Sequence, residues 1–305
     1  MPNKNFDTCV SFHINNGAFR GRLVRLDEVV NTILTKHAYP LPVSAVLAES
    51  TALAILLAST LKYDGLFTLQ TQSNGPVSMV VVDVTSDGKV RACAQYNEEH
   101  LARSQKLRKT EGEIEPTPHL LGEGWLAFTV DQGSDTKCYQ GVVDLQGKTL
   151  SECALRYFKQ SEQIDTDLQL FIHAPQGDST RWSAAGIFIQ KLPELGGKID
   201  ENIDLTESWN EAKIFMESLK ADEVFDSNLS SEEILHRLYH SNALSISTLK
   251  EYSFGCRCSR EKVQNTLASF NPEEVESLGE DGHIAVTCNF CSEKYLFEKG
   301  EILKQ

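Results

Sequence analysis

The stretch VSAVLAESTALAILLASTL, residues 43–61, decides the fold. It is almost continuously apolar and about as long as a membrane-spanning helix. However, Glu49 and several hydroxyl residues lie inside it, and no cluster of Lys or Arg flanks it. Membrane spans are usually flanked by basic residues and exclude internal carboxylates. We therefore interpret the stretch as a helix, from Val43 to Lys62, that is buried in a soluble core and does not cross a membrane.

Downstream of this helix, the apolar period changes from helical to strand-like. Segments 66–72, 77–84 and 90–96 each predict a β-strand. Turn residues separate them, as Ser73-Asn74-Gly75-Pro76 and as Ser86-Asp87-Gly88-Lys89. Such short connections join antiparallel neighbours, so the three segments predict an antiparallel meander.

Most of the rest of the first 195 residues shows either the helical or the strand-like apolar period. A short helix, carried by apolar residues between 26 and 34, is expected to end at the prolines of Tyr39–Pro42. Residues 97–117 are charged and lack an apolar period, so we interpret them as an exposed loop with some helix. The other predicted elements are strands at 125–130, 137–145, 168–174 and 184–192 and a helix at 149–163. Helices and strands are grouped, which predicts an α+β fold with an N-terminal antiparallel-sheet-plus-helices core domain, residues 1–195.

The composition changes at Pro193–Gly197, where a segment rich in acidic residues begins. Between residues 196 and 250, apolar residues form only a narrow helical stripe, which includes Trp209, Phe215, Met216 and Leu219. Ser230 and Glu233 fit a capping box that opens one of the helices. Helices with so narrow a stripe are marginal alone. We interpret residues 196–250 as a helical, metastable linker region docked on the first domain; the alternative is two ordinary helices of one larger domain.

Residues 251–305 contain two closely spaced pairs of cysteines. The pattern is Cys256-Arg257-Cys258, then 29 residues, then Cys288-Asn289-Phe290-Cys291. A segment this short needs a staple to fold. Zinc prefers four thiolates in a tetrahedron, and structural sites are built from two short-range pairs. We therefore predict a small C-terminal zinc-binding domain with one Zn²⁺ on Cys256, Cys258, Cys288 and Cys291.

The residues between and after the cysteine pairs predict a compact module. A helix is expected at 259–270 and a second, shorter one at 273–278, which ends at Gly279. Residues 284–287 predict a strand that leads into the second cysteine pair. The apolar residues Tyr295, Leu296 and Phe297 are expected to pack beneath that pair.

The cysteine spacing also permits redox chemistry. A disulfide needs Cα atoms about 4.4–6.8 Å apart. Residues i and i+3 of a turn satisfy this easily, whereas i and i+2 do so only where the chain bends. Zinc keeps thiols deprotonated and therefore nucleophilic. Four nearby basic residues are expected to favour the thiolates further: Arg257, Arg260, Lys262 and Lys294.

Metal loss would remove folding free energy on the order of 10 kcal/mol from such a module. Oxidation of the thiols is therefore expected to unfold it, which is the chemistry of a switch. The alternative is a purely structural zinc in a zinc-ribbon module that binds nucleic acid or protein.

These motifs resemble those of the 33 kDa chaperonin family, the redox-regulated bacterial heat-shock holdases. The resemblance is carried first by Gly255–Glu261, Glu280–Ile284 and Cys288–Phe297. Shorter matches upstream extend it over nearly the whole chain: Tyr39-Pro40, Leu47–Glu49, Thr60–Gly65, Gly75-Pro76, Tyr139–Val143, Tyr157–Gln163, Ala184–Gly186 and Leu235–His240.

The resemblance implies a cytoplasmic chaperone that holds zinc and has little activity when reduced. It implies that oxidants form disulfides within each pair, Cys256–Cys258 and Cys288–Cys291. Zinc then leaves, the C-terminal domain and the linker unfold, and the protein forms a homodimer that binds unfolding clients without ATP. A holdase needs apolar surface that can be hidden and exposed. The candidates here are the linker stripe of Trp209, Phe215, Met216 and Leu219 and the first-domain surface beneath it.

Other classes of function are disfavoured. The formal net charge of −14 disfavours a nucleic-acid partner. The chain lacks P-loop, GxSxG and HExxH motifs, and four thiolates leave a metal no open position, so we do not expect an enzyme. The scattered Cys9, Cys93, Cys138 and Cys153 are interpreted as small buried hydrophobes. His283 is interpreted as an exposed loop residue and not as a ligand.

Overall fold

The computed structural model describes residues 6–110, 114, 117–132, 138–147, 149–175, 181–192, 204–279 and 282–302. It divides into two compact units, Met1–Phe254 and Gly255–Gln305, and each is described here by itself. The predicted change of segment at 193–197 lies outside the described residues, as do Lys137, Glu280 and Asp281. Both units combine helices with antiparallel strands, so the predicted α+β class is confirmed.

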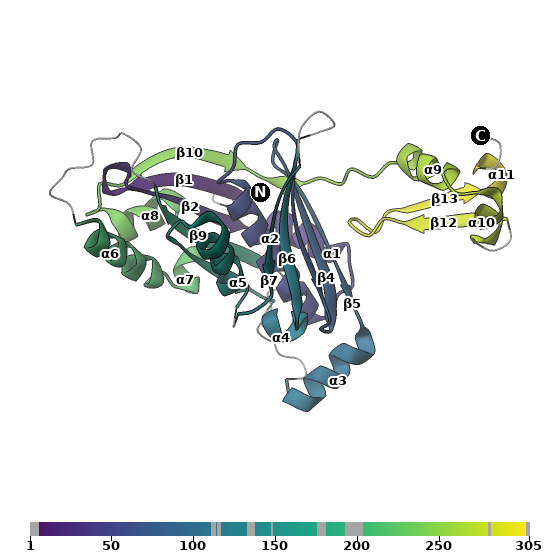
Figure 1. Ribbon diagram of the computed structural model, residues 1–305, viewed down its shortest axis with the longest axis horizontal. Coiled ribbons are helices and arrows are strands. Elements are labelled where there is room, and N and C mark those ends of the chain that lie inside the picture. Colours follow the sequence, from purple (N-terminus) through teal and green to yellow (C-terminus); the bar gives the residue numbers. More distant parts are fainter. Residues whose placement is uncertain are drawn as a thin grey trace. The chain divides into compact units, whose positions relative to one another are not determined.

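The first unit contains two sheets (Figure 1). The five-stranded sheet has the order β10-β1-β2-β9-β8 and is antiparallel throughout. Its strands are β1 (Thr8–Ile14), β2 (Phe19–Leu26), β8 (Thr166–His173), β9 (Ser183–Lys191) and β10 (Ser245–Glu251). The six-stranded sheet has the order β11-β5-β4-β3-β6-β7, and only the β11–β5 pair is parallel. Its strands are β3 (Leu66–Ser73), β4 (Val77–Thr85), β5 (Lys89–Tyr96), β6 (Gly124–Asp131), β7 (Tyr139–Asp144) and β11 (Ser253–Phe254).

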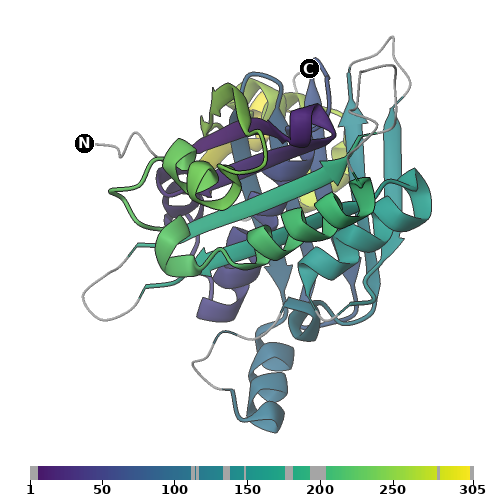
Figure 2. The ribbon, with the colours of Figure 1, turned by 90° about the vertical axis from the view of Figure 1, so that its left-hand side faces the viewer.

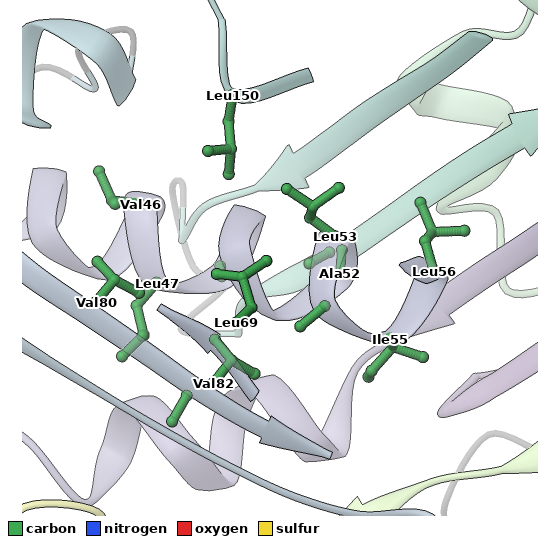
Figure 3. Close-up of a cluster of buried hydrophobic side chains, with 14 of the residues drawn as sticks. Val46, Leu47, Ala52, Leu53, Ile55, Leu56, Leu69, Val80, Val82 and Leu150 are labelled. Carbon is green, nitrogen blue, oxygen red and sulfur yellow. The ribbon is translucent and has the colours of Figure 1, made fainter. Parts of the chain in front are cut away.

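Helix α2 (Leu41–Ala58) lies between the two sheets and forms the centre of the main core. Every residue of this helix except Leu41 and Glu49 is buried. Figure 3 shows its leucine and valine side chains beside Leu69, Val80 and Val82 of the six-stranded sheet. Toward the other sheet, a Cβ on Gly186 would lie 2.5 Å from Leu56 Cδ1, so only glycine permits this close approach.

Helix α2 is long and apolar enough to span a membrane, but 89% of that window is buried inside the protein. This burial agrees with the interpretation of residues 43–61 as a core helix. The predicted bounds were wrong at both ends. The helix begins at Leu41 because Pro42 occupies the first turn, where no amide hydrogen bond is needed. It ends at Ala58, where the Ser59 hydroxyl donates to the Leu56 carbonyl oxygen at 2.6 Å.

The shorter predicted helix and the three-stranded meander are confirmed, as α1 (Glu28–Thr35) and β3-β4-β5. The predicted helix at 149–163 is α5 (Leu150–Tyr157), continued by a π-helical turn at Phe158–Glu162. Residues 97–117, predicted as an exposed loop with some helix, contain helix α3 (Glu98–Arg108), and most of its side chains are exposed. Leu101 is its one buried residue, so the helix has no apolar stripe in the sequence. A short helix, α4 (Thr117–Leu121), follows.

Five strands were not predicted: β1, β2, β10 and β11 of the first unit and β13 (Lys294–Glu298) of the second. Strand β1 carries Val10, Phe12 and Ile14 at alternate positions, and all three are fully buried. The strand period was therefore present in the sequence there. Strand β10 pairs with β1 from the other end of the unit, and its mostly exposed side chains show no alternation.

Three helices cover the outer face of the five-stranded sheet, as Figure 2 shows for the green helices. They are α6 (Leu205–Glu217), α7 (Ala221–Val224) and α8 (Ser231–Tyr239). The capping box of Ser230 and Glu233 is confirmed at the start of α8. These helices and the sheet enclose a second core, which includes Phe12, Phe19 and Ile187. Helices α6, α7 and α8 lie within the predicted linker region, residues 196–250, but residues 245–250 of that region belong to strand β10. Its role as a separate, metastable linker stays a prediction.

The second unit has a small core of its own. Its elements are α9 (Arg260–Ala268), α10 (Pro272–Ser277), β12 (His283–Thr287), β13 (Lys294–Glu298) and α11 (Lys299–Ile302). The two predicted helices and the strand at 284–287 are confirmed. Its buried apolar residues are Leu267, Val275, Ile284, Phe297 and Ile302. The expected packing of Leu296 is wrong, because that side chain is 58% exposed on the outer face of β13.

Candidate metal centre and the docked helices

The four cysteines of the second unit lie at the ends of regular elements. Cys256 and Cys258 precede α9, whose first turn is capped by the Ser259 hydroxyl oxygen. Cys288 and Cys291 lie in the turn between β12 and β13. In that turn the Cys288 amide donates to the Glu293 carbonyl oxygen, and the Ser292 amide donates to the Cys288 carbonyl oxygen, both at 2.9 Å. Ser292 is left-handed, with φ 57°, which tightens the turn.

The fold brings the four sulfur atoms together. The Sγ atoms of Cys256 and Cys258 are 3.3 Å apart. Across the two pairs, Cys256 Sγ is 3.7 Å from Cys288 Sγ, and Cys258 Sγ is 3.4 Å from Cys291 Sγ. All four lie within 4.8 Å of one another. These distances exceed the S–S bond of about 2.05 Å, so the sulfur atoms are separate.

This arrangement fits a thiophilic metal ion. A tetrahedral zinc site with Zn–S bonds of about 2.3 Å has S···S edges of about 3.8 Å. The separations of 3.3–3.7 Å are close to that edge. The donor set is four soft sulfur atoms, which is the set that zinc and similar metals prefer.

The electrostatics of the cluster also favour a cation. Burial raises the pKa of Cys291, and hydrogen bonds with the neighbouring thiols add to this. Burial opposes ionisation of Cys256 as well, but hydrogen bonds from the Cys258 main chain and thiol outweigh it and lower its pKa to about 7. The cluster alone thus favours one thiolate and opposes several. A divalent cation among the sulfur atoms supplies the charge that stabilises all four thiolates.

A hydroxyl group supports the cluster from β13. Tyr295 Oη donates a hydrogen bond to Cys258 Sγ at 3.2 Å. The sequence pattern predicted that Tyr295 packs beneath the cysteines as an apolar residue. It did not predict the hydrogen bond of its hydroxyl group. Groups that hydrogen-bond to a ligand orient it and tune its basicity. In the sequence, the only indication of this hydrogen bond was that Tyr295 lies four residues after Cys291.

The neighbouring basic residues have other partners. Arg260 donates to the Leu296 carbonyl oxygen at 2.7 Å and forms an ion pair with Glu301 at 2.8 Å. Its guanidinium also lies 4.3 Å from the centre of the Phe297 ring. Lys262 Nζ donates to the Arg257 carbonyl oxygen at 2.9 Å. These contacts connect the first cysteine pair and α9 to β13 and α11, which gives them a structural role.

The other candidate residues are placed as follows. Cys9, Cys93 and Cys153 are buried, as predicted, whereas Cys138 is exposed, so its interpretation as a buried hydrophobe was wrong. His283 is exposed, as predicted, although it lies at the start of β12 and not in a loop.

Helices α6, α7 and α8 are called the docked helices. Their apolar stripe faces the five-stranded sheet. Trp209, Met216 and Leu219 are buried in the second core, and Phe215 is partly buried against it. Trp209 packs edge-on against Phe19 of β2, with ring centres 5.2 Å apart. The stripe is therefore hidden by the sheet that it covers.

Arg25 of β2 connects the end of α7 and the segment between α7 and α8 to the sheet. This residue was not among the candidates predicted from the sequence. Its side chain is fully buried. It donates to three carbonyl oxygens, those of Val224 at 2.8 Å, Asp226 at 2.6 Å and Leu229 at 2.6 Å. Burial lowers its pKa to about 10, although nearby acidic side chains oppose this shift. The cation is thus held mainly by the backbone of a segment about 200 residues away in the chain.

Comparison with known proteins gives concordant matches. The family model described as Hsp33 protein matches residues 7–298. The chain is 36% identical over 304 residues to the 33 kDa chaperonin of Pseudomonas fluorescens (strain SBW25), covering 99% of this chain and 93% of that one. It is also 36% identical over 294 residues to the 33 kDa chaperonin of Caulobacter vibrioides (strain NA1000 / CB15N), covering 95% and 94%. The crystal structure of the 33 kDa chaperonin from Thermotoga maritima has the same fold, with a TM-score of 0.78, 22% identity and coverage of 98% and 97%.

Proposed function

This chain belongs to the Hsp33 family of chaperones, and we propose that it is a redox-regulated, ATP-independent holdase that binds unfolding proteins under oxidative stress. The observation that supports the redox part is the cluster of four sulfur atoms within 4.8 Å, in a unit where the described residues include a core of five buried apolar side chains. So small a core is not expected to be stable without a further link.

Cys256, Cys258, Cys288 and Cys291 would hold one Zn²⁺ in the reduced protein. When bound, zinc would keep the four sulfurs as thiolates and link the segment before α9 to the turn between β12 and β13. Tyr295 orients Cys258 through its hydroxyl group. The fold of the second unit then depends on the ionised, reduced state of its cysteines.

Oxidation is proposed to form the disulfides Cys256–Cys258 and Cys288–Cys291. Each pair of thiolates gives up two electrons to an oxidant such as hypochlorite, which, with one water molecule, is reduced to chloride and two hydroxide ions while the S–S bond forms. The Cys256 and Cys258 sulfur atoms are 3.3 Å apart, so a small movement brings them to bonding distance. A disulfide sulfur is a poor metal ligand, because it carries no negative charge. The second unit would therefore lose its metal and unfold.

The linker region, residues 196–250, is proposed to be metastable and to undock once the second unit unfolds. Undocking would expose the stripe of Trp209, Phe215, Met216 and Leu219 together with the sheet face beneath it. That face includes Phe12, Phe19 and Ile187, which are fully buried while the helices cover it. Contiguous apolar surface of this kind binds unfolding proteins.

The remaining parts of the proposal concern assembly and location. The oxidised protein is proposed to form a homodimer and to act in the cytoplasm. We propose no catalytic activity, because four thiolates leave no open position on a metal. We propose no nucleic-acid partner, because a formal net charge of −14 repels phosphate backbones.

The test is suppression of aggregation by reduced, metal-loaded protein and by oxidised protein. We expect suppression by the oxidised form only. The variant Cys288→Ser with Cys291→Ser cannot form the second disulfide, and the matched control Cys138→Ser removes an exposed thiol outside the cluster. Equal suppression by reduced and oxidised wild-type protein would reject the switch and favour the alternative, a module with a purely structural zinc.

A further inference from the structure

Strand β10 is held at the edge of the five-stranded sheet mainly by its backbone, with side-chain hydrogen bonds from Ser247 and Lys250 to the carbonyl oxygens of Ser11 and Ser86. It pairs with β1 from Thr8↔Glu251 to His13↔Ser245. Six of its seven residues are exposed, and the seventh, Lys250, is partly exposed. Its apolar residues Ile246 and Leu249 are 39% and 51% exposed. Side-chain burial therefore contributes little to the attachment of this strand.

Strand β1, by contrast, is buried on both faces. Cys9 lies in the main core, whereas Val10, Phe12 and Ile14 lie in the second core. Strand β1 would remain in place through β2 if β10 left. Its unpaired amide and carbonyl groups would then form a free sheet edge, which is a template for another strand.

The position of β10 in the chain connects it to the switch. Only residues 252–255 separate β10 from Cys256, and β10 falls largely within the proposed linker region. The first disulfide would therefore form just beyond this strand. Release also requires Tyr252, which is buried in the main core, and β11, which pairs with β5, to detach. Because β10 itself buries so few side chains, we expect it to follow them at low further cost.

We propose that the edge of β1 that β10 vacates is a client-binding site, which takes an extended segment of an unfolding protein with apolar residues at alternate positions. This inference rests on the proposed function and adds the place and the mode of binding. The client segment forms main-chain hydrogen bonds with β1, and these do not depend on its sequence. Its alternate apolar side chains extend the sheet face formed by Val10, Phe12 and Ile14.

The occupant is inferred from β10 itself. This segment, SISTLKE, shows that the edge accepts an extended chain without demanding side-chain pockets. The pairing also accommodates an irregularity between Ser11 and Phe12, so the edge tolerates imperfect register. Unfolding proteins expose β-prone segments that lack partners, and such segments fit this edge.

The test is an engineered disulfide, called the staple, that keeps β10 paired with β1. Cys9 is the register partner of Lys250, so Lys250→Cys places a second thiol opposite Cys9. The matched control is Lys250→Ser, which also removes the lysine contact with the Ser86 carbonyl oxygen but cannot form a staple. Both variants are oxidised, the Cys9 disulfide is confirmed by peptide mass spectrometry, and suppression of aggregation is measured with urea-denatured malate dehydrogenase.

We expect oxidised Lys250→Ser to suppress aggregation as wild type does. Stapled Lys250→Cys should suppress clearly less although its metal is released, because it keeps only the binding that the exposed helices and sheet face provide. Suppression by stapled protein equal to that of Lys250→Ser would overturn the inference and leave the proposed function intact. If oxidised wild-type protein does not suppress aggregation at all, the proposed function fails, and this inference fails with it.

Hydrogen exchange gives a second measurement that needs no staple. In wild-type protein, the β1 amides that face β10 should be protected when reduced, exchange quickly when oxidised, and be protected again when oxidised protein holds the malate dehydrogenase. Protection that persists in oxidised, client-free protein would overturn the inference. Rapid exchange that persists with client bound would overturn it equally.

Discussion

Replacing Arg25 with Ala is expected to release the docked helices without any oxidant. Arg25 is fully buried and donates to the carbonyl oxygens of Val224, Asp226 and Leu229 at 2.6–2.8 Å. Val224 is the last residue of α7, and Asp226 and Leu229 lie in the connection between α7 and α8. The substitution removes the group that ties this connection to β2, while leaving the apolar contacts of α6 and α8 in place.

The size of the effect follows from these contacts. Hydrogen bonds to a charged group contribute roughly 1.5–3 kcal/mol each. Their sum is offset by the several kcal/mol that burial of a guanidinium costs. The substitution removes the charge itself and leaves three carbonyl oxygens without this donor, at about 1–3 kcal/mol for each that stays buried. With the burial cost of the guanidinium recovered, we expect a net destabilisation of about 3–5 kcal/mol. The docked-to-undocked ratio should fall roughly a hundredfold to several thousandfold.

The assay combines hydrogen exchange of residues 205–239 with aggregation suppression by reduced, metal-loaded protein. The matched control is Arg22→Ala on the same strand. Arg22 is bonded to the Ser59 and Gly21 carbonyl oxygens, at 3.2 Å and 2.7 Å, and not to the docked helices. We expect Arg25→Ala to accelerate exchange across the helices and to suppress aggregation when reduced, and Arg22→Ala to do neither.

Two results would refute this reasoning. The first is unchanged exchange of residues 220–230 in Arg25→Ala, which would mean that the apolar stripe alone holds the helices. The second is faster exchange without any gain in suppression by the reduced protein. In that case the docked helices would not be what hides the client-binding surface.

Three further substitutions test separate contacts. Tyr295→Phe removes the hydrogen bond to Cys258 and should weaken zinc binding about tenfold in competition with a chromogenic chelator, whereas equal affinity would contradict a supporting role. Ser230→Ala removes the capping box of α8 and should destabilise that helix by about 1 kcal/mol, seen as faster exchange of its amides; unchanged exchange would count against it. Burial raises the pKa of Glu49 above 4.5, so the folded protein binds this proton more tightly than the unfolded chain does, and stability should fall as pH rises through that window. Glu49→Gln should therefore melt at a higher temperature than wild type at pH 8, and this gain should shrink toward acidic pH; a gain independent of pH would contradict this origin.

Local patterns explain which parts of the fold the sequence predicted. The buried helix and the β3-β4-β5 meander are continuous segments whose period or turn residues are set by their own neighbours. The bounds of helix α3 could not be predicted within its exposed segment, because its side chains face solvent and carry no apolar stripe. Strand β10 was missed for the same reason, since exposed side chains do not alternate and its partner β1 is more than 200 residues away.

The cysteine cluster was predictable because metal ligands must come in closely spaced pairs. The residues that support the cysteine cluster and the docked helices were not predictable, because their roles depend on tertiary contacts. Tyr295 has an ordinary position in an apolar strand, and only the fold brings its hydroxyl group to Cys258. In the sequence, Arg25 resembles an ordinary surface residue. In the fold, the segment from Val224 to Leu229 covers it and accepts its hydrogen bonds. In both cases the polar partner comes from a distant segment of the chain.

The most direct test of the account is to count metal and thiols in the same sample before and after a stoichiometric oxidant, while the second unit is followed by NMR. We expect reduced protein to carry one zinc ion per chain and dispersed resonances for residues 255–302. After oxidation, the zinc should be free, Cys256, Cys258, Cys288 and Cys291 should be consumed together, and the dispersion should be lost. Oxidised protein that keeps both its metal and a folded second unit would contradict the account, as would reduced protein without thiolate-bound metal.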